Sequence, residues 1–283
     1  MSSLDCFQSP LNLVPTVRLR ILSIYFAVAA VVSVIGLSIA TAQEKVTSLR
    51  ILTFNIHHGE GTDGNIDLPR QAKVILDSKA DLVCLQEVDD RTERTGRVDQ
   101  TAELAKLTGF HGEFVHQIDF EGGRYGQALL SRYPISQAEC HWLPGTPDRE
   151  RRMAGAVRLK VHEQSITLVT THLHHNNEPF RIEQARTLDR IFRSEKYSDS
   201  IVIIAGDFNA TPDSEPLKIL QEYWVSVGNA SEPLLTFPAE KPERQLDYIL
   251  IGASSGVKVR NVHVIDEPLA SDHRPLLAEL RLP

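Results

Sequence analysis

Six apolar, strand-like runs in this sequence end on, or lie beside, a carboxylate, amide or imidazole side chain. The clearest run covers residues 201–204 and predicts a strand that is covered on both faces, with Gly206 letting the chain turn where the strand emerges. Asp207 and Asn209 follow at once, although Asp and Asn are also ordinary turn residues. The full set of polar residues at these places is Asn55, Glu87, His172, Asp207, Asn209, Asp247, Asp272 and His273. Six such places in one chain indicate a site rather than chance.

The chemical type of these side chains limits what they could bind. They are hard oxygen groups or imidazoles, and no cysteine is among them. Such a set suits Mg²⁺, Mn²⁺ or Ca²⁺ rather than a structural zinc ion.

The order of elements along the chain is mixed. Helical patterns are expected at 67–78, 99–109, 176–192 and 215–222, and the other periodic segments are strand-like. Many strands with few helices predict an α/β (α+β) fold, a four-layered sandwich of two mainly antiparallel sheets with helices outside. Each half opens with a strand that ends in a polar cluster, so we expect two similar lobes whose strand ends converge.

The N-terminal segment 1–43 is set apart from this fold. Residues 21–40 carry no charge, follow Arg18 and Arg20, and are long enough to cross a bilayer. They predict either an uncleaved membrane anchor or a signal peptide cleaved after Ala42, before Gln43. Both alternatives place residues 44–283, the expected catalytic domain, outside the cytoplasm, either secreted, periplasmic or anchored.

Charge and cysteine content exclude some classes of protein. Without residues 1–43, which hold two arginines and one aspartate, 28 basic and 36 acidic side chains remain, a formal charge of −8. A domain of this net charge does not offer a polyanion-binding surface overall. If the protein were a nuclease, only scattered arginines such as Arg91, Arg94 and Arg97 would be available to bind the nucleic acid. Cys84 and Cys140 are expected to be free, with a single bridge between them as the alternative.

Seven motifs taken together carry a resemblance to a known family. The segments LTFNIHHG, CLQEVD, YGQALLSRYPI, VTTHLHH, AGDFNATP, QLDYIL and SDHRPL, spread over 49–282, resemble the endonuclease/exonuclease/phosphatase superfamily of deoxyribonuclease I-like enzymes. The resemblance implies the same four-layered sandwich and a divalent-metal-dependent hydrolysis of a phosphate ester. It also implies Mg²⁺ or Mn²⁺ as the cofactor, in a number that the sequence does not fix.

By this resemblance the site residues acquire roles. Glu87 is implied as the principal metal ligand, with Asn55 and Asp272 binding the metal or its waters.

The catalytic residues follow in the same way. Asp207 and Asn209 resemble the pair that orients the attacking water, contacts the phosphate or binds a second metal. His273, polarised by Asp247, and His172 on the opposite lobe resemble the phosphate-facing histidines. The sequence leaves open whether His273 acts as an acid or as a base.

Three further residues are candidates for substrate binding. One of Arg151 and Arg152 is expected to face the phosphate, although a solvated charge run explains them equally well. Tyr125 lies before a strand and is expected either to line the cleft or to pack at its rim.

Four histidines next to site residues are not expected to be ligands. His57 and His58 follow Asn55 and are expected at the rim of the site, while at most one of His174 and His175 should face the same way as His172.

The predicted function is therefore hydrolysis of a phosphodiester or phosphomonoester by in-line attack of water. The subclass stays open between a nuclease and a phosphoesterase for lipids or small molecules, so the partner is a nucleic acid, a phospholipid or a small phosphoester. We expect a monomer that touches the membrane only through an uncleaved N-terminal segment. The alternative from another class is a catalytically silent binding module on the same fold.

Overall fold

The computed structural model describes residues 48–146, 151–228 and 233–283. The predicted N-terminal segment, residues 1–43, lies outside the described residues. Within the described ranges, no helix has the length and apolar character needed to span a bilayer.

The first sheet is built mostly from the N-terminal half of the fold and contains one parallel pair. Its strand order is β11-β12-β1-β2-β4-β3, and only β1 and β2 run parallel. The strands are β1 (Ser48–Asn55), β2 (Leu82–Asp90), β3 (His111–Phe120), β4 (Gly123–Ser131), β11 (Lys258–Val264) and β12 (Leu276–Arg281).

The second sheet repeats the plan of the first. Its order is β5-β6-β7-β8-β10-β9, and again only one pair, β7 with β8, is parallel. The strands are β5 (Ile135–Trp142), β6 (Met153–Val161), β7 (Gln164–His172), β8 (Ile201–Asp207), β9 (Trp224–Ser226) and β10 (Asp247–Gly252). In strand order and direction β1 and β2 correspond to β7 and β8, which confirms the expectation of two similar lobes.

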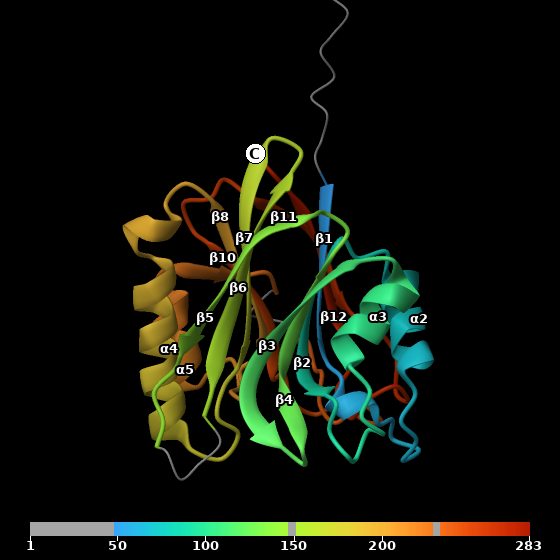
Figure 1. Cartoon of the computed structure of the whole chain (residues 1–283). Helices are drawn as coiled ribbons and strands as arrows, with labels where there is room; N and C mark the ends of the chain where they lie inside the picture. The colour runs from blue at the N-terminus through green and yellow to red at the C-terminus, as the bar shows by residue number, and fades with distance from the viewer. Residues whose placement is uncertain (1–47, 147–150, 229–232) are drawn as a thin grey trace, which may run out of the picture. The chain divides into compact units, whose positions relative to one another are not determined.

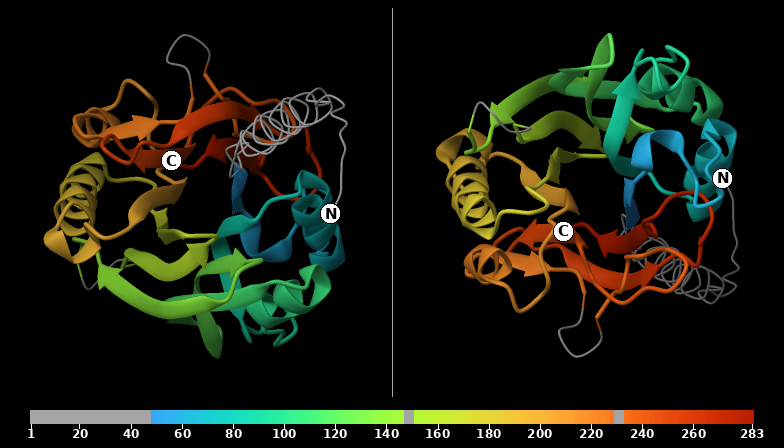
Figure 2. Two further views of the ribbon diagram at one scale, coloured as in Figure 1. Left: turned by 90° about the horizontal axis from the view of Figure 1, so that it is seen from above. Right: turned by 90° about the horizontal axis from the view of Figure 1, so that it is seen from below.

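Helices cover the outer face of each sheet, as Figures 1 and 2 show. The first sheet carries α2 (Leu68–Ser78) and α3 (Gln100–Thr108), and the second carries α4 (Glu178–Phe192) and α5 (Glu215–Gln221). Short 3-10 turns occur at η1 (His57–Gly59) and η2 (Glu195–Tyr197). In each lobe one helix connects the parallel pair of strands, because a parallel pair needs a crossover connection.

The apolar core forms three clusters that match the layers. One cluster lies between the sheets and includes Cys84, Leu168 and Ile203, while the other two join each sheet to its own helices. The predicted four-layered sandwich is therefore confirmed. Both Cys84, which is buried, and Cys140, which is exposed, are free thiols, as expected.

Two details of the strands differ from the sequence prediction. Strand β9 has only three residues, too few to give a recognisable period of two. The prediction of a turn at Gly206 was wrong, because β8 continues to Asp207 and Gly206 pairs with Thr171 on one side and Tyr248 on the other. A Cβ at Gly206 would lie 1.9 Å from the carbonyl oxygen of Thr171, so the glycine permits close approach of two strands.

Replacing Gly206 should therefore destabilise the fold at the strand that carries Asp207. We expect Gly206→Ala to lower the free energy of unfolding by about 3 kcal/mol, because the clash is with backbone and cannot be relieved by a side-chain rotation. Urea unfolding of the full chain measures this free energy. Gly145→Ala is the matched control, since no described atom lies within 4 Å of a Cβ there. Equal stability of the two variants would contradict the close-approach argument.

Candidate active site

The strand ends of the two lobes meet at one end of the sandwich. Asn55 is the last residue of β1, His172 the last of β7 and Asp207 the last of β8, and Asp247 begins β10 opposite Asp207. His172 and Asp207 also pair directly in the parallel ladder. The convergence expected from the sequence is therefore present, and it follows from the register of the two central pairs of strands.

Glu87 is aimed by an irregularity in its own strand. The pairing of β2 with β4 skips Glu87 between Gln86 and Val88, and Glu87 has a left-handed backbone with φ 58°. A bulge of this kind turns one side chain away from the regular alternation. Glu87 is only partly buried, whereas its neighbours along the strand are fully buried. The bulge thus leaves one carboxylate accessible within an otherwise buried strand, which continues to Asp90.

Asn55 links the carboxylates of the two lobes. Its Nδ2 donates to Glu87 Oε1 at 3.0 Å and to Asp207 Oδ2 at 3.2 Å, and its Oδ1 accepts from the backbone N–H of His57 at 3.1 Å. The side chain is fully buried. Asn55 therefore holds two negative groups close together and fixes the start of the following turn.

Asp207 lies at the centre of the site. Its Oδ2 is 3.5 Å from Nε2 of His172 and 3.7 Å from Nε2 of His273, and its Oδ1 accepts from the backbone N–H of Asn209 at 2.8 Å. Burial raises the pKa of Asp207, the His273 charge opposes that rise, and the nearby charge of Asp247 adds to it. A buried carboxyl group of raised pKa is suited to exchanging a proton.

His273 and Asp247 form a buried pair. His273 Nδ1 is 2.9 Å from Asp247 Oδ2, and both side chains are almost fully buried. Burial alone would lower the pKa of His273, but the charges of Asp247 and Asp207 outweigh it and raise that pKa. The ring is therefore a cation at neutral pH, with Nδ1–H donating to Asp247 and Nε2–H facing Asp207.

His172 differs from His273 in its charge. Burial, with the charge of Arg152 as the next largest cause, holds the pKa of His172 well below its usual value. His172 is therefore neutral at neutral pH. The two imidazoles on either side of Asp207 consequently differ in protonation, which gives the site one cationic donor and one neutral ring.

Asn209 lies in the loop that follows β8, and Asp272 lies in the loop that precedes β12. Asn209 has φ 48°, and its Nδ2 donates to the carbonyl oxygen of Leu173 at 3.1 Å. Asp272 is partly exposed, and its Oδ1 lies 3.3 Å from Oγ of Ser271. The Asn209 side chain is therefore held by the residue that follows β7, and that of Asp272 by its neighbour Ser271.

Of the three substrate-binding candidates, Arg152 has the best-supported position. It is 2 % exposed, its Nη2 lies 3.4 Å from Nδ1 of His175, and its charge acts on His172. Arg151 is exposed and lies over the ring of Trp142, 3.6 Å from its centroid. Tyr125 is near Phe120 and is covered by Arg94. The roles of Arg151 and Tyr125 stay predictions.

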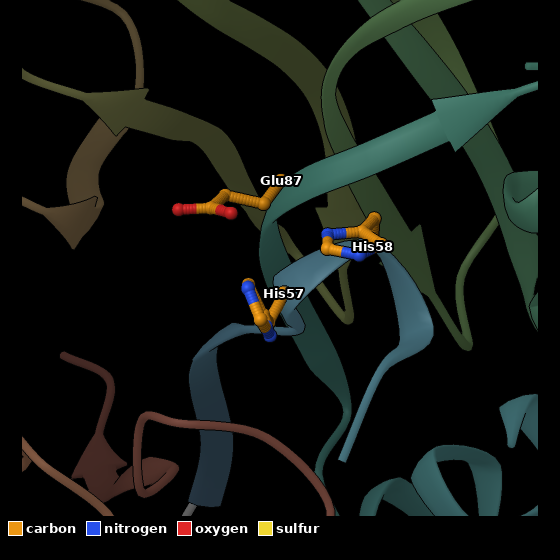
Figure 3. Close-up of side chains that lie close together, drawn as sticks. All are labelled: His57, His58 and Glu87. Carbon is orange, nitrogen blue, oxygen red and sulfur yellow. The ribbon is translucent and has the colours of Figure 1, made fainter. Parts of the chain in front are cut away.

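Among the described residues, two groups of acid and imidazole atoms are close enough together to hold a cation. Asp207, Asp247 and His273 form one group, and Glu87 with His57 and His58 forms the other, with ligand atoms within 4.8 Å of one another in each. Figure 3 shows the second group, where both histidines come from the turn after β1 and Glu87 from the bulge within β2. Asp272 is in neither group, so its ligand role stays a prediction.

The adjacent pair His174 and His175 has other surroundings. Their rings stack on each other, and His174 is buried while His175 is exposed. The expectation that at most one of them faces the same way as His172 stays a prediction.

The structure adds residues that the sequence analysis did not single out. Ser271 Oγ donates to the carbonyl oxygen of Asn55 at 2.7 Å and accepts from the backbone N–H of His273 at 3.3 Å. Behind the site, Gln86 Nε2 donates to Thr170 Oγ1, which donates to Gln127 Oε1, both at 3.1 Å. These bonds join the two sheets through buried polar groups. The sequence contained a signal for the three residues behind the site, because each is a polar residue within an apolar strand.

A pocket of about 360 Å³ opens beside the site. Its lining includes His57 and Asp272 on the site's side, and Glu60, Thr62, Pro238 and Glu240 around it. Three of these residues are carboxylates, so the pocket is acidic.

The fold and the gathered acid, amide and imidazole groups define a hydrolase of the four-layered sandwich class. The chain belongs to the endonuclease/exonuclease/phosphatase family, whose model matches residues 52–273. The family and the enzyme class that the sequence predicted, a hydrolase acting on phosphoester bonds, are both confirmed by this match.

The chain is also similar to individual proteins and solved structures. The uncharacterized protein YbhP of Escherichia coli (strain K12) is 28 % identical over 260 residues, which cover 85 % of this chain and 99 % of YbhP. An endonuclease/exonuclease/phosphatase from Bacteroides vulgatus has the same fold, with a TM-score of 0.69, 22 % identity, and coverage of 84 % and 100 %. The mannosyl-6-phosphatase Bt3783 of Bacteroides thetaiotaomicron VPI-5482 matches with a TM-score of 0.65, 17 % identity, and coverage of 82 % and 99 %.

The protonation of His273 gives a direct prediction. Because its pKa is raised, the ring should stay charged as the pH rises past the ordinary histidine value of about 6.5, and lose its proton only at higher pH. Asp247→Asn should lower the pKa of His273, since it removes the largest stabilising charge. Nitrogen-15 NMR of the imidazoles against pH measures both. Asp199→Asn, at an exposed ion pair with Arg158, is the control. Loss of the His273 proton near pH 6.5 in all three proteins would contradict this account.

Proposed function

We propose that the protein hydrolyses a small phosphoester outside the cytoplasm, by in-line attack of water and with the help of a divalent cation. The observation that carries the proposal is that Asp207 lies between a cationic His273 and a neutral His172 at one end of the sandwich. A site that combines a donor cation with a buried carboxyl group can both stabilise phosphate charge and move a proton.

The donor set fits Mg²⁺ or Mn²⁺. Glu87 is partly exposed and its Oε2 accepts no hydrogen bond from the described residues, while Oε1 accepts only from Asn55. Oδ1 of Asp247 is buried without a hydrogen-bond partner in the described part of the chain. Such oxygen atoms are the ligands that Mg²⁺ prefers. A cation bound by such oxygen atoms would stabilise the negative charge on the phosphate oxygens.

The chain's own residues then account for the proton and charge movements. His273 donates Nε2–H to a phosphate oxygen or to the leaving oxygen, and Asp247 keeps the ring charged and oriented. Asp207, with its raised pKa, accepts the proton of the attacking water. Asn209 lies beside Asp207 and orients that water, and Arg152 contributes positive charge near His172. This assignment gives His273 the acid role that the sequence had left open.

Charge and shape favour a small substrate over a nucleic acid. Arg91 pairs with Asp90 and Asp99, Arg94 with Asp89, and Arg97 with Glu93. These arginines are therefore engaged within the protein and do not form a row for a phosphate backbone. The acidic pocket beside the site would repel further phosphates of a polymer, while it can accept hydroxyl groups as hydrogen-bond donors.

A substrate panel tests the proposal with the full chain and Mg²⁺ or Mn²⁺. The panel contains sugar phosphates, inositol phosphates, glycerophosphodiesters, sphingomyelin, phosphatidylinositols, plasmid DNA and RNA. The proposed function requires the highest kcat/KM among the small water-soluble esters. A preference for DNA, RNA or a lipid would refute the substrate class, and hydrolysis of none would refute the activity.

Removing the cation or its main carboxylate should stop hydrolysis. We expect a chelator to abolish activity, and Glu87→Gln to lower kcat by at least about 100-fold while the unfolding transition stays in place, because Glu87 is partly exposed and not in the core. Glu121→Gln is the matched control, since Glu121 also has a left-handed backbone but is exposed on another loop. Full activity in excess chelator would contradict the metal-dependent mechanism.

The location outside the cytoplasm rests on the N-terminal sequence. Residues 21–40 should direct the chain to the membrane and place the catalytic domain on its outer side, because the flanking arginines precede the apolar run. N-terminal sequencing of the protein from membrane and soluble fractions measures the outcome. A start at Gln43 in the soluble fraction indicates a cleaved signal peptide, and an intact chain in the membrane indicates an anchor. An intact chain in the cytoplasm would overturn the location.

A further inference from the structure

We propose that His57 and His58 join Glu87 in a nitrogen-containing site for a divalent transition-metal ion, beside the oxygen donors of the hydrolytic site. The potential ligand atoms of the three side chains lie within 4.8 Å of one another. Metal–ligand bonds of about 2.0–2.2 Å bring ligand atoms to separations of roughly 3–4.4 Å, so a small side-chain rotation closes the group around an ion.

His58 carries a buried ring nitrogen that has no hydrogen-bond partner among the described residues. Its Nε2 lies 3.4 Å from Oε2 of Glu60, which directs the Nε2–H and leaves Nδ1 as the lone-pair atom. Nδ1 is buried and has no hydrogen-bond partner in the described residues, and the residue is only 9 % exposed. A purely structural role would leave this buried polar atom without a protein partner, which is unfavourable. A carboxylate behind a histidine is also a common arrangement at metal sites.

The turn that carries the two histidines is held firmly against β2. The backbone N–H of His57 donates to Asn55 Oδ1, and Gln100 Nε2 donates to the carbonyl oxygen of His58 at 2.7 Å. Oε1 of the same buried Gln100 accepts from the backbone N–H of Asp89 at 2.9 Å, two residues after Glu87. One side chain therefore fixes the distance between the histidine turn and the strand of Glu87.

The two rings are also available to a cation. The ring nitrogens of His57 make no hydrogen bond within the described residues, and His57 lines the acidic pocket. All three residues of the group have left-handed backbones, with φ of 45°, 44° and 58° for His57, His58 and Glu87. Such strain persists only where surrounding contacts enforce it.

The chemistry of the group selects its ion. Two imidazole nitrogens with one carboxylate suit borderline ions such as Mn²⁺, Co²⁺ or Zn²⁺ better than Mg²⁺, which prefers oxygen alone. The group shares Glu87 with the hydrolytic site, but its test measures ligation and not hydrolysis. The failure of either proposal can therefore be recognised separately.

The test is electron spin echo envelope modulation of Mn²⁺ bound to the full chain, prepared without added tag histidines, since this method detects nitrogen bonded to the ion. We expect nitrogen modulation in the unmodified protein. His57→Gly and His58→Gly should each weaken Mn²⁺ binding by at least about 10-fold, and the double variant should lose the modulation. Glycine is chosen because it accepts a left-handed backbone without strain.

The matched control is His162→Gly, at an exposed histidine that also has a left-handed backbone, φ 53°, in the turn between β6 and β7. It should leave the affinity and the modulation unchanged. Mn²⁺ that binds the unmodified protein without nitrogen modulation would overturn the proposal, whether or not the variants fold. Modulation that persists in the folded double variant would overturn it as well, because it would assign the nitrogen to another histidine.

Discussion

The burial of Asp207 between the two sheets is the constraint on which the site depends. A carboxylate taken out of water needs hydrogen bonds and opposite charge, and here these come from Asn55 and His273 in one lobe and from the Asn209 backbone in the other. The two lobes therefore cannot shift relative to each other without leaving Asp207 unsatisfied. The reactive groups are held by the same contacts that join the sheets, which keeps them preorganised.

The buried polar chain behind the site strengthens this coupling. Gln86, Thr170 and Gln127 join the sheets where the apolar core would otherwise reach the site. Each member is hydrogen-bonded, and hydrogen bonds are directional. The network therefore fixes the position of one sheet relative to the other more specifically than hydrophobic contacts alone would. The positions of the strand ends thus follow from specific bonds as well as from apolar packing.

The sequence predicted most of the fold, because strand and helix periods and capping residues are local signals. Asp67, Asp99 and Asn177 each accept a hydrogen bond from the first turn of a helix that had been expected there. The bulge at Glu87 and the role of Ser271 could not be predicted in this way. A bulge depends on the register with β4, and the bond from Ser271 to Asn55 spans 216 positions of the chain. The family motifs indicated which residues form the site, but the division between a cationic His273 and a neutral His172 required their burial and neighbouring charges.

The two lobes repeat one arrangement of strands, but the carboxylates that they place at the site lie in different environments. In one lobe Asn55 ends the parallel pairing and Glu87 follows its last partner, Gln86, while in the other lobe His172 and Asp207 end the corresponding pair. Glu87 is turned outward by its bulge and stays accessible to a cation, while Asp207 is buried and its pKa is raised. Groups of the same type in different environments can divide cation binding and proton transfer between them. The difference between the lobes, more than their similarity, therefore makes the site able to catalyse a reaction.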